Sequence, residues 1–277
     1  MTLKNLLRNK LTEKHLAFVP SSFDIIGNRD KAVAIIEVPD ELERKAALIA
    51  KALMKHHKNV KTVFLKASER KGIYRLRKLK LITGNRNSVV THVESGCKFL
   101  LDPKKVYFSP REGTERLRLA NLVNNEETVM VFFAGIGSFP IVIAKKSKPQ
   151  AVIGIEINPD AWEYFSKNTK LNKAENIHVI LGDVREKAVE FYGSCNRVIM
   201  PLPESAIDYF EYAIGCLKNR GVIHLYCFSE ENKVNNKVKK ISAICRKFKK
   251  RCSVSSTKVL PYGPGIYKYR LDIRVQR

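Results

Sequence analysis

The sequence predicts an α/β protein in which a doubly wound, mostly parallel sheet follows a small α+β domain. The first observation behind this prediction is an alternation of apolar strands and helical stretches from Val129 onward. Such alternation is typical of a parallel sheet with helices on both faces. The second is a change of pattern near the C-terminus, where two strands joined by a Pro/Gly turn at 261–265 would add an antiparallel hairpin. The expected strands of the sheet are 129–133, 151–155, 177–181, 197–200 and 222–228, and the expected helices are 139–147, 160–171, 205–217 and 233–249.

The N-terminal part reads as a smaller domain with its own strands and one helix. Pro39 and Asp40 open the expected helix, with Asp40 as its cap and Glu43 three residues later, a pairing typical of helix starts. Apolar segments bounded by turn residues predict strands at 23–26, 32–38, 60–65, 89–93 and 97–101. The sequence therefore predicts three parts: a basic N-terminal arm at 1–20, a small α+β domain at 21–105, and a larger domain at 106–277.

Net charge is the strongest global signal. The 277 residues include 51 Lys and Arg against 27 Asp and Glu, which gives a formal net charge of +24. An excess of this size favours a polyanionic partner, of which nucleic acid is the commonest, although a lysine-rich surface without such a partner would give the same total. Between positions 61 and 86 there are nine basic residues and one acidic residue. This imbalance favours a surface that contacts phosphates over an ordinary solvated strand face. The small α+β domain at 21–105 is therefore predicted to bind RNA.

The chain lacks the sequence signals of membrane insertion, secretion and metal binding. No apolar run approaches the roughly 20 residues of a membrane-spanning helix, and the N-terminus carries no signal-peptide pattern. The six cysteines are dispersed and none forms a Cys-x-x-Cys pair, so neither a zinc site nor a disulfide framework is expected. The expectation is a cytoplasmic monomer with free thiols, no metal and no membrane contact.

A Gly-rich loop and two acidic residues predict an adenosine-containing ligand. Gly135 and Gly137 lie between the first strand of the sheet and the next helix, where glycine lets a ligand approach the backbone. Glu156 ends the second strand, where a carboxylate can accept hydrogen bonds from ribose hydroxyls. Asp183 follows the third strand, where it can accept one from an adenine amine. The alternative is a tight glycine turn that binds nothing.

S-adenosyl-L-methionine is favoured over a nicotinamide dinucleotide as this ligand. The third glycine that helps to seat a pyrophosphate is absent, because Phe139 and Pro140 stand after Ser138. An acidic residue after the third strand and an antiparallel C-terminal hairpin are typical of methyltransferases and not of dehydrogenases. The sequence therefore predicts a sulfonium cofactor at the carboxyl ends of the strands.

The chain resembles the tRNA guanine-37 N1-methyltransferases of archaea and eukaryotes, together with the related wyosine-pathway transferases. The resemblance covers about residues 22–277 and is most specific at 106–116, which reads Val-Tyr-Phe-Ser-Pro-Arg-Glu-Gly-Thr-Glu-Arg. It implies a Rossmann-like class I methyltransferase domain, S-adenosyl-L-methionine as cofactor and the anticodon arm of tRNA as partner. The other segments that carry it are 72–84, 94–102, 133–137, 197–203 and 262–265.

The resemblance also implies roles for individual residues. N1 of guanine must lose its proton to a base, and the charge that then develops on O6 needs a cation or a donor. Glu115 is the implied base and Arg75 the implied partner of O6. Simpler roles are an ion pair with Arg111 or Arg118 for Glu115, and a phosphate contact for Arg75. Pro201 is also implied to border the reacting atoms, and the residues implied to contact the cofactor are Arg116, Phe133, Gly135, Glu156, Ile157, Asp183, Val184 and Pro201.

Two positions depart from the family pattern. Phe132 stands where an Asp often precedes the Gly-rich loop, and Pro201 stands where the methyltransferase branch usually has an Asn. Proline keeps a carbonyl acceptor but lacks both the amide side chain and the N–H group. The Pro-Leu-Pro loop at 201–203 nevertheless resembles an archaeal methylating variant more than the aminocarboxypropyl branch, which tends to have Met-Gly here.

The expected function is methyl transfer from S-adenosyl-L-methionine to N1 of guanine 37 in tRNA, and methylation of C7 of the tricyclic wyosine precursor is left open as a second product. An aminocarboxypropyl transferase acting on the same nucleotide is the enzymatic alternative. An RNA-binding module with a vestigial cofactor pocket is the alternative of another class, which the intact Glu156 and Asp183 disfavour. A small-molecule methyltransferase is disfavoured by the net charge of +24.

Overall fold

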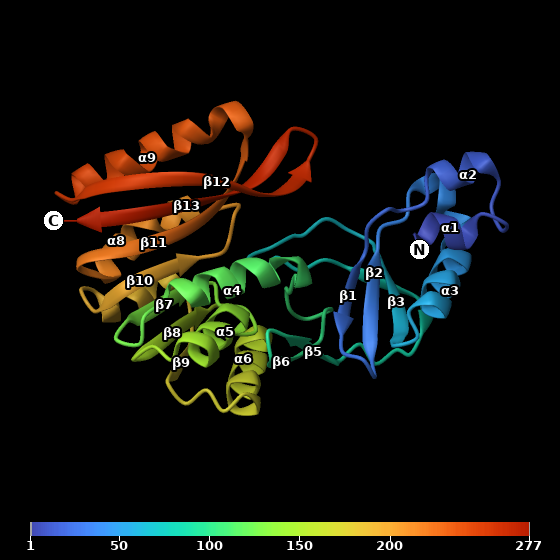
Figure 1. The fold of residues 1–277 in the computed structure, drawn as a ribbon, viewed down its shortest axis with the longest axis horizontal. Helices are drawn as coiled ribbons and strands as arrows, with labels where there is room; N and C mark the ends of the chain where they lie inside the picture. The colour runs from blue at the N-terminus through green and yellow to red at the C-terminus, as the bar shows by residue number, and fades with distance from the viewer. Residues whose placement is uncertain (1, 277) are drawn as a thin grey trace. The chain divides into compact units, whose positions relative to one another are not determined.

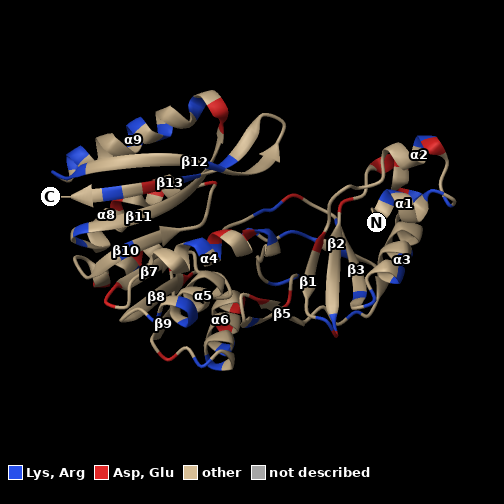
Figure 2. Ribbon diagram, in the orientation of Figure 1, with Lys and Arg blue, Asp and Glu red and all other residues tan. Residues whose placement is uncertain are grey.

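The computed structural model describes residues 2–276 and contains two compact units, divided between Thr114 and Glu115 (Figure 1). Met1 and Arg277, the outer limits of the predicted domains, lie outside the described residues. Each unit has a hydrophobic cluster of its own. Lys and Arg residues occur on strands, helices and loops of both units (Figure 2).

The first unit is an α+β domain built on a four-stranded sheet in the order β1-β2-β3-β4. β2 and β3 are parallel, and β1 and β4 pair with them in the antiparallel sense. β5 and β6 form a separate antiparallel pair. The strands are β1 (Asp24–Gly27), β2 (Ala32–Ile36), β3 (Val60–Lys66), β4 (Leu79–Gly84), β5 (Val90–Glu94) and β6 (Cys97–Leu101), and the helices are α1 (Leu3–Leu7), α2 (Glu13–Ala17), η1 (Asp40–Lys45), α3 (Ala46–His56) and η2 (Pro110–Glu112).

The segment expected to form a basic arm contributes apolar side chains to the core of the first unit. Thr2 and Thr12 cap the short helices α1 and α2, because their hydroxyls accept main-chain N–H groups. Leu3, Leu7 and Leu16 are buried in the same cluster as the apolar face of α3. The apolar residues of this segment thus attach it to the sheet, and the division between units falls after Thr114 instead of after residue 105. The predicted cap at Asp40 is wrong, because Pro39 holds the capping position without a side-chain hydrogen bond.

The second unit contains a seven-stranded sheet in the order β12-β13-β11-β10-β7-β8-β9. The five strands from β11 to β9 in this order are parallel neighbours, while β13 is antiparallel to both β11 and β12. The predicted parallel sheet and C-terminal hairpin are therefore confirmed. The strands are β7 (Thr128–Phe132), β8 (Ala151–Glu156), β9 (Ile177–Leu181), β10 (Cys195–Met200), β11 (Leu217–Glu230), β12 (Arg251–Gly263) and β13 (Ile266–Gln276).

Helices connect these strands and cover the sheet (Figure 1). Because β8 and β9 lie on one side of β7 and β10 lies on the other, the chain reverses its direction of travel across the sheet at β7. Ligands of open α/β sheets bind at the carboxyl ends of the strands at such a reversal. The helices are α4 (Gly113–Leu122), α5 (Ser138–Ser147), α6 (Pro159–Leu171), α7 (Val184–Lys187), η3 (Ala188–Phe191), η4 (Ala206–Tyr209), α8 (Phe210–Cys216), η5 (Glu231–Lys233) and α9 (Val234–Lys247).

The cysteines are free thiols, as the sequence predicts, and five of the six are buried. Within residues 2–276, no helix has both the length and the apolar character needed to span a bilayer. In the same part of the chain, no group of three or more His, Cys, Asp or Glu side chains is arranged to hold a metal ion.

Candidate active site

The Gly-rich loop after β7 depends on left-handed backbone conformations. Phe133, Gly135 and Gly137 have φ values of +55°, +58° and +83°. A Cβ atom on Gly137 would lie 2.1 Å from Cδ2 of Phe165 in α6, so only glycine allows this close approach. Of the three, only Phe133 is not a glycine, so its positive φ is strained. The ring of Phe133 packs edge-on against Tyr209 with 4.9 Å between the centroids. Strain of this kind concentrates at functional sites.

Glu156, the last residue of β8, holds the Gly-rich loop in place by a hydrogen bond. Its carboxylate accepts hydrogen bonds from the N–H groups of Gly135 (2.7 Å) and Asn158 (2.8 Å). Burial raises the pKa of Glu156, and hydrogen bonds from the backbone, including that of Ile157, act against the rise. A carboxylate offers about four acceptor positions, so Glu156 can accept a further donor such as a ribose hydroxyl. The predicted residue therefore fits an adenosine moiety.

Asp183 follows β9 and caps α7. It accepts the N–H of Arg185 (2.8 Å), and both of its oxygens lie 3.1 Å from Nε of the same residue. The hydrogen bond from the Arg185 side chain is the main reason that the pKa of Asp183 is lowered. Asp183 is thus an anion at neutral pH and an acceptor at the strand end. Its neighbour Val184 is buried in the core of the unit, while Ile157, after β8, is half-buried.

The two departures from the family pattern occupy different settings. Phe132 is fully buried in the core, so this position offers no polar group to a ligand. Pro201 directly follows β10, the strand next to β7, and therefore lies at the reversal point beside the Gly-rich loop. The loop is anchored on both sides, since the carbonyl oxygens of Leu202 and Pro203 accept the N–H groups of Ala206 (3.1 Å) and Phe228 (3.2 Å).

Glu115, in the first turn of α4, is the centre of a buried polar network. Its Oε1 atom accepts a hydrogen bond from Nη1 of Arg270 (2.9 Å). Its Oε2 atom accepts from Oη of Tyr226 (2.7 Å) and from Nε of Arg118 (3.0 Å). Burial, and then the charge of Glu115, raises the pKa of Tyr226 well above its ordinary value, so the phenol keeps its proton and donates. The ion pair with Arg118 is one of the simpler roles that the sequence leaves open.

The network continues along paired residues of β11 and β13. The register pairs Tyr226 with Arg270 and His224 with Asp272, and Nε of Arg270 donates to Asp272 (2.8 Å). Nη1 of Arg197 lies 2.7 Å from Nε2 of His224. A guanidinium can only donate, so Nε2 accepts and Nδ1 carries the proton that is donated to Asp272. Burial lowers the pKa of His224. Burial alone would raise the pKa of Asp272, but the hydrogen bond from His224 outweighs it, and the pKa of Asp272 is lowered to about 2.

Arg116 is buried beside the helix that follows the Gly-rich loop. Its side chain is only 1% exposed, and its guanidinium carbon lies 5.7 Å from the ring centroid of Phe139 in α5. A buried guanidinium near the Gly-rich loop suits the carboxylate of a methionine moiety. The predicted contact between Arg116 and the cofactor stays a prediction with this geometry as its basis.

In the first unit, Arg75 lies on a tight loop between β3 and β4. The N–H of Lys71 donates to the carbonyl of Leu76 (2.9 Å), and the N–H of Arg75 donates to that of Gly72 (3.1 Å). Both Gly72 (+70°) and Arg75 (+55°) have positive φ. The loop therefore presents the Arg75 side chain through a conformation that non-glycine residues rarely adopt.

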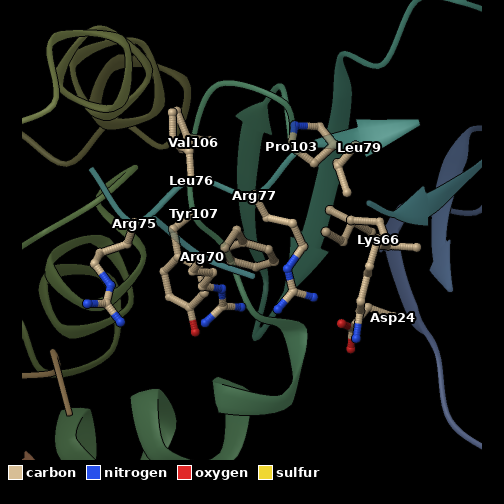
Figure 3. Close-up of a pocket in the computed structure, with 13 residues that line it drawn as sticks. Asp24, Lys66, Arg70, Arg75, Leu76, Arg77, Leu79, Pro103, Val106 and Tyr107 are labelled. Carbon is tan, nitrogen blue, oxygen red and sulfur yellow. The ribbon is translucent and has the colours of Figure 1, made fainter. Parts of the chain in front are cut away.

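Arg75 lines a pocket of the first unit together with other cationic side chains (Figure 3). The guanidinium carbon of Arg70 lies 4.1 Å from the ring centroid of Tyr107. Nε of Arg77 is buried, and it has no hydrogen-bond acceptor among the described residues. The carboxylate of Asp24 is engaged by Nε of Arg111 (2.7 Å), so positive charge dominates and suits an anionic or electron-rich group. The charged residues that line the pocket are Asp24, Lys66, Arg70, Arg75 and Arg77.

Sequence reasoning missed Tyr226 and Arg270 as partners of Glu115. They lie more than a hundred residues beyond it, and no local motif connects them to α4. One signal was present: polar residues at 268, 270, 272 and 274 alternate with apolar ones in the last strand, which places the polar residues on one face. That pattern identifies the face but not its partner.

The strand order, the antiparallel β13 and the Gly-rich loop with Glu156 and Asp183 define a class I S-adenosylmethionine-dependent methyltransferase domain. A family profile described as the TRM5/TYW2 methyltransferase domain matches residues 90–255, and one described as the TYW2 N-terminal domain matches residues 3–87. The chain therefore belongs to the TRM5/TYW2 methyltransferase family.

Curated relatives cover most of the chain. It is 42% identical over 260 residues to the tRNA (guanine(37)-N(1))-methyltransferase Trm5b of Pyrococcus abyssi, a match that covers 93% of this chain and 76% of that protein. It is 33% identical to the tRNA (guanine(37)-N(1))/4-demethylwyosine(37)-methyltransferase Taw22 of Nanoarchaeum equitans, with 91% and 99% covered.

Solved structures agree with these relatives. The crystal structure of Pyrococcus abyssi Trm5b has a TM-score of 0.87 and 40% identity, and the match covers 96% of this chain and 79% of that one. The complex of aTrm5 with tRNALeu has a TM-score of 0.84 and 31% identity, with 99% and 78% covered. The structure of M. jannaschii TYW2 in complex with AdoMet has a TM-score of 0.72 and 28% identity, with 92% and 100% covered.

Proposed function

We propose that this protein transfers a methyl group from S-adenosyl-L-methionine to N1 of guanine 37 in tRNA. The observation that carries the proposal is the buried carboxylate of Glu115, which three donors orient in the unit that also holds the cofactor residues. The 42% identity to a guanine-37 N1-methyltransferase supports the same assignment.

In this proposal Glu115 is the general base. It accepts the proton on N1 of guanine, so the electron pair of that nitrogen becomes the nucleophile. Arg118, Arg270 and Tyr226 hold the carboxylate in one orientation, which removes the entropic cost of placing it during turnover. Arg75 stabilises the negative charge that builds up on O6 once N1 has lost its proton.

The cofactor residues divide their work between the two ends of the ligand. S-adenosyl-L-methionine supplies an electrophilic methyl group on a sulfonium when it is bound. Glu156 and Asp183 offer acceptors to the ribose and the adenine, with Ile157 and Val184 beside them. Arg116 offers a cation at the methionine end, and the backbone of Phe133 and Gly135 allows close approach. Pro201, which can only accept, borders the reacting atoms.

Two observations favour a second product, the C7-methylated wyosine precursor. Pro201 stands where the guanine-37 branch usually has an Asn, and the relative from Nanoarchaeum equitans carries both activities in its name. Without the amide of an Asn, this position cannot donate a hydrogen bond to the base, so it discriminates less between guanine and the wyosine precursor. We therefore include this second substrate in the proposal.

Labelled cofactor and nucleoside mass spectrometry test the assignment. Unmodified tRNA incubated with methyl-labelled cofactor should give 1-methylguanosine at position 37, and carboxyl-labelled cofactor should leave the RNA unlabelled. Glu115→Gln should lower turnover by about 10²-fold or more, since general base catalysis typically contributes that much, with little change in tRNA affinity. Label from the carboxyl position in RNA would instead identify aminocarboxypropyl transfer.

Binding to the anticodon arm of tRNA is the proposed interaction. The net charge of +24 and the basic segment at 61–86 support it, as does the solved complex of a relative with tRNALeu. The dissociation constant should therefore rise steeply with salt, because each phosphate contact releases counterions. The monomeric, metal-free form expected from the sequence belongs to the same proposal, and light scattering and activity with a chelator test it.

A further inference from the structure

Tyr262 is an exposed aromatic residue that the proposed mechanism does not use. It lies at the tip of the β12–β13 hairpin and is 57% exposed. Residues 262–265, Tyr-Gly-Pro-Gly, form one of the segments that carry the family resemblance, yet none of them has a role in the transfer step. An aromatic side chain this exposed on a highly cationic protein suggests contact with a ligand that has a π-face.

The ring of Tyr262 is held in place from one side. It stacks on Phe228 of β11, with 3.8 Å between the ring centroids and 29° between the planes. The turn that carries it contains Pro264 and ends at Gly265, whose φ of +69° closes the hairpin. One face of Tyr262 is therefore covered by Phe228, and the residue is pre-ordered before any ligand arrives.

The stacked pair lies at the edge of the sheet where the parallel strands have their carboxyl ends, and this edge also carries the cofactor residues. Phe228 lies near the carboxyl end of β11, which runs parallel to β10. The N–H of Phe228 donates to the carbonyl of Pro203 (3.2 Å). β13 is antiparallel to β11, and so its first residues and the tip of the hairpin lie at this same edge. Tyr262 thus stands next to the loop that begins at Pro201.

We propose that the outer face of Tyr262 stacks on an unpaired nucleobase next to the target base of the RNA substrate. The inference rests on the proposed function, because it takes the substrate to be an RNA whose target base leaves its stack. A neighbouring base then loses one of its stacking partners, and an aromatic ring at the rim of the site replaces it. Base–aromatic stacking is typically worth about 1–3 kcal/mol per base and tolerates any base identity.

Kinetics with an anticodon stem-loop RNA test this subsite. Tyr262→Ala should raise KM about tenfold with a smaller change in kcat, and Tyr262→Trp should restore it, because both tyrosine and tryptophan supply a π-face. Tyr192→Ala is the matched control: Tyr192 is 50% exposed and precedes β10, so it lies at the opposite edge of the sheet. Thermal melting of each variant separates a local effect from unfolding.

Abasic substrates identify the base. The stem-loop is made with an abasic nucleotide on one side or the other of the target guanine, and wild type and Tyr262→Ala are compared on each. We expect the tenfold difference to disappear with one of the two abasic RNAs. A difference that persists on both, or an equal loss in Tyr192→Ala, overturns the proposal. Failure of wild type to methylate the intact RNA would instead refute the proposed function.

Discussion

The two residues proposed to act on the base are held by opposite means. Glu115 is buried and is fixed by side-chain donors from three elements, α4, β11 and β13. Arg75 lies on a loop whose shape is set by main-chain hydrogen bonds and by positive φ at Gly72 and Arg75. Glu115 is therefore placed by side chains of paired strands, whereas Arg75 is placed by the backbone of a turn.

This difference indicates which kind of substitution should impair Glu115 and which should impair Arg75. A carboxylate that must take a proton benefits from a fixed position, because a misplacement of about 1 Å can cost 10²-fold in rate. A guanidinium that must meet charge on an incoming base is placed by the backbone of its loop, and most of the charged residues beside it in the pocket are cations. Substitutions in the two regions should therefore differ in which measured quantity they change.

Among substitutions other than that of Glu115 itself, the largest effect is expected for Arg75→Gln. Loss of a donor that stabilises developing charge typically lowers kcat by about 10²–10³-fold, and the fold of the first unit should be retained because the side chain lines a pocket. Arg75→Lys should recover only part of the rate, since it keeps the charge but not the planar fork. Single-turnover methyl transfer at saturating RNA measures both variants.

Lys71→Gln is the matched control for Arg75, because it removes a cation from the same loop. It should weaken RNA binding modestly and leave the single-turnover rate within a factor of about three, as expected for a screened surface contact. Equal rate losses in the Lys71 and Arg75 variants would reduce Arg75 to an ordinary phosphate contact.

Arg270→Gln should have the next largest effect. It removes the donor to Oε1 of Glu115 and leaves Arg118 and Tyr226 on Oε2. We expect turnover to fall by about 10²-fold through misplacement of the base, with RNA affinity unchanged. Arg274→Gln, an exposed arginine on the same strand, should behave as wild type. A loss of RNA affinity without a loss of turnover in Arg270→Gln would contradict the positioning role.

The fold of the second unit could be predicted because each of its signals is local. The strand–helix alternation, the loop at Gly135 and Gly137 and the acids at the strand ends all lie within a few residues of the element that they identify. The C-terminal hairpin was equally visible from its Pro/Gly turn. In the first unit, by contrast, Leu3, Leu7 and Leu16 looked like part of a basic arm, because short apolar helices have little periodicity of their own.

The partners of the candidate base could not be predicted. Tyr226 and Arg270 reach Glu115 only after β11 and β13 pair in a particular register, and a shift of β13 by one residue would turn Arg270 to the other face. Sequence patterns give the face of a strand but not its register. Residues whose roles depend on register are therefore found from coordinates, whereas glycines that need positive φ can be found from their motif.

A smaller effect is expected for Gly72→Ala in the Arg75 loop. A Cβ atom at Gly72 meets nothing within 4 Å, so only the φ of +70° is strained, at a cost of about 1 kcal/mol. Gly193→Ala is matched to it, with φ +71° and equally open space, but lies in the second unit. Urea unfolding should show similar losses in both, while turnover should fall only in Gly72→Ala, by less than about tenfold. Equal turnover in the two variants would show that the loop backbone does not place Arg75.

The smallest effect concerns the far end of the Glu115 network, where His224 and Asp272 make stability depend on pH. The pKa of His224 is lower in the folded protein than its ordinary 6.5, so the unfolded chain binds this proton more readily. Stability that His224 contributes is complete above pH 6.5 and decreases as the pH falls below it. The pKa of Asp272, about 2 against an ordinary 3.8, adds a further loss between those two values.

The measurement is urea unfolding of wild type and His224→Gln between pH 7.5 and 5. Glutamine can accept from Arg197 and donate to Asp272 as the neutral imidazole does, but it does not titrate. Wild type should lose stability relative to the variant as the pH falls, with a slope of at most about 1.4 kcal/mol per pH unit for one proton. A wild type that gains stability relative to His224→Gln would mean that the folded state binds the proton better, and the neutral histidine deduced from its contact with Arg197 would then be wrong.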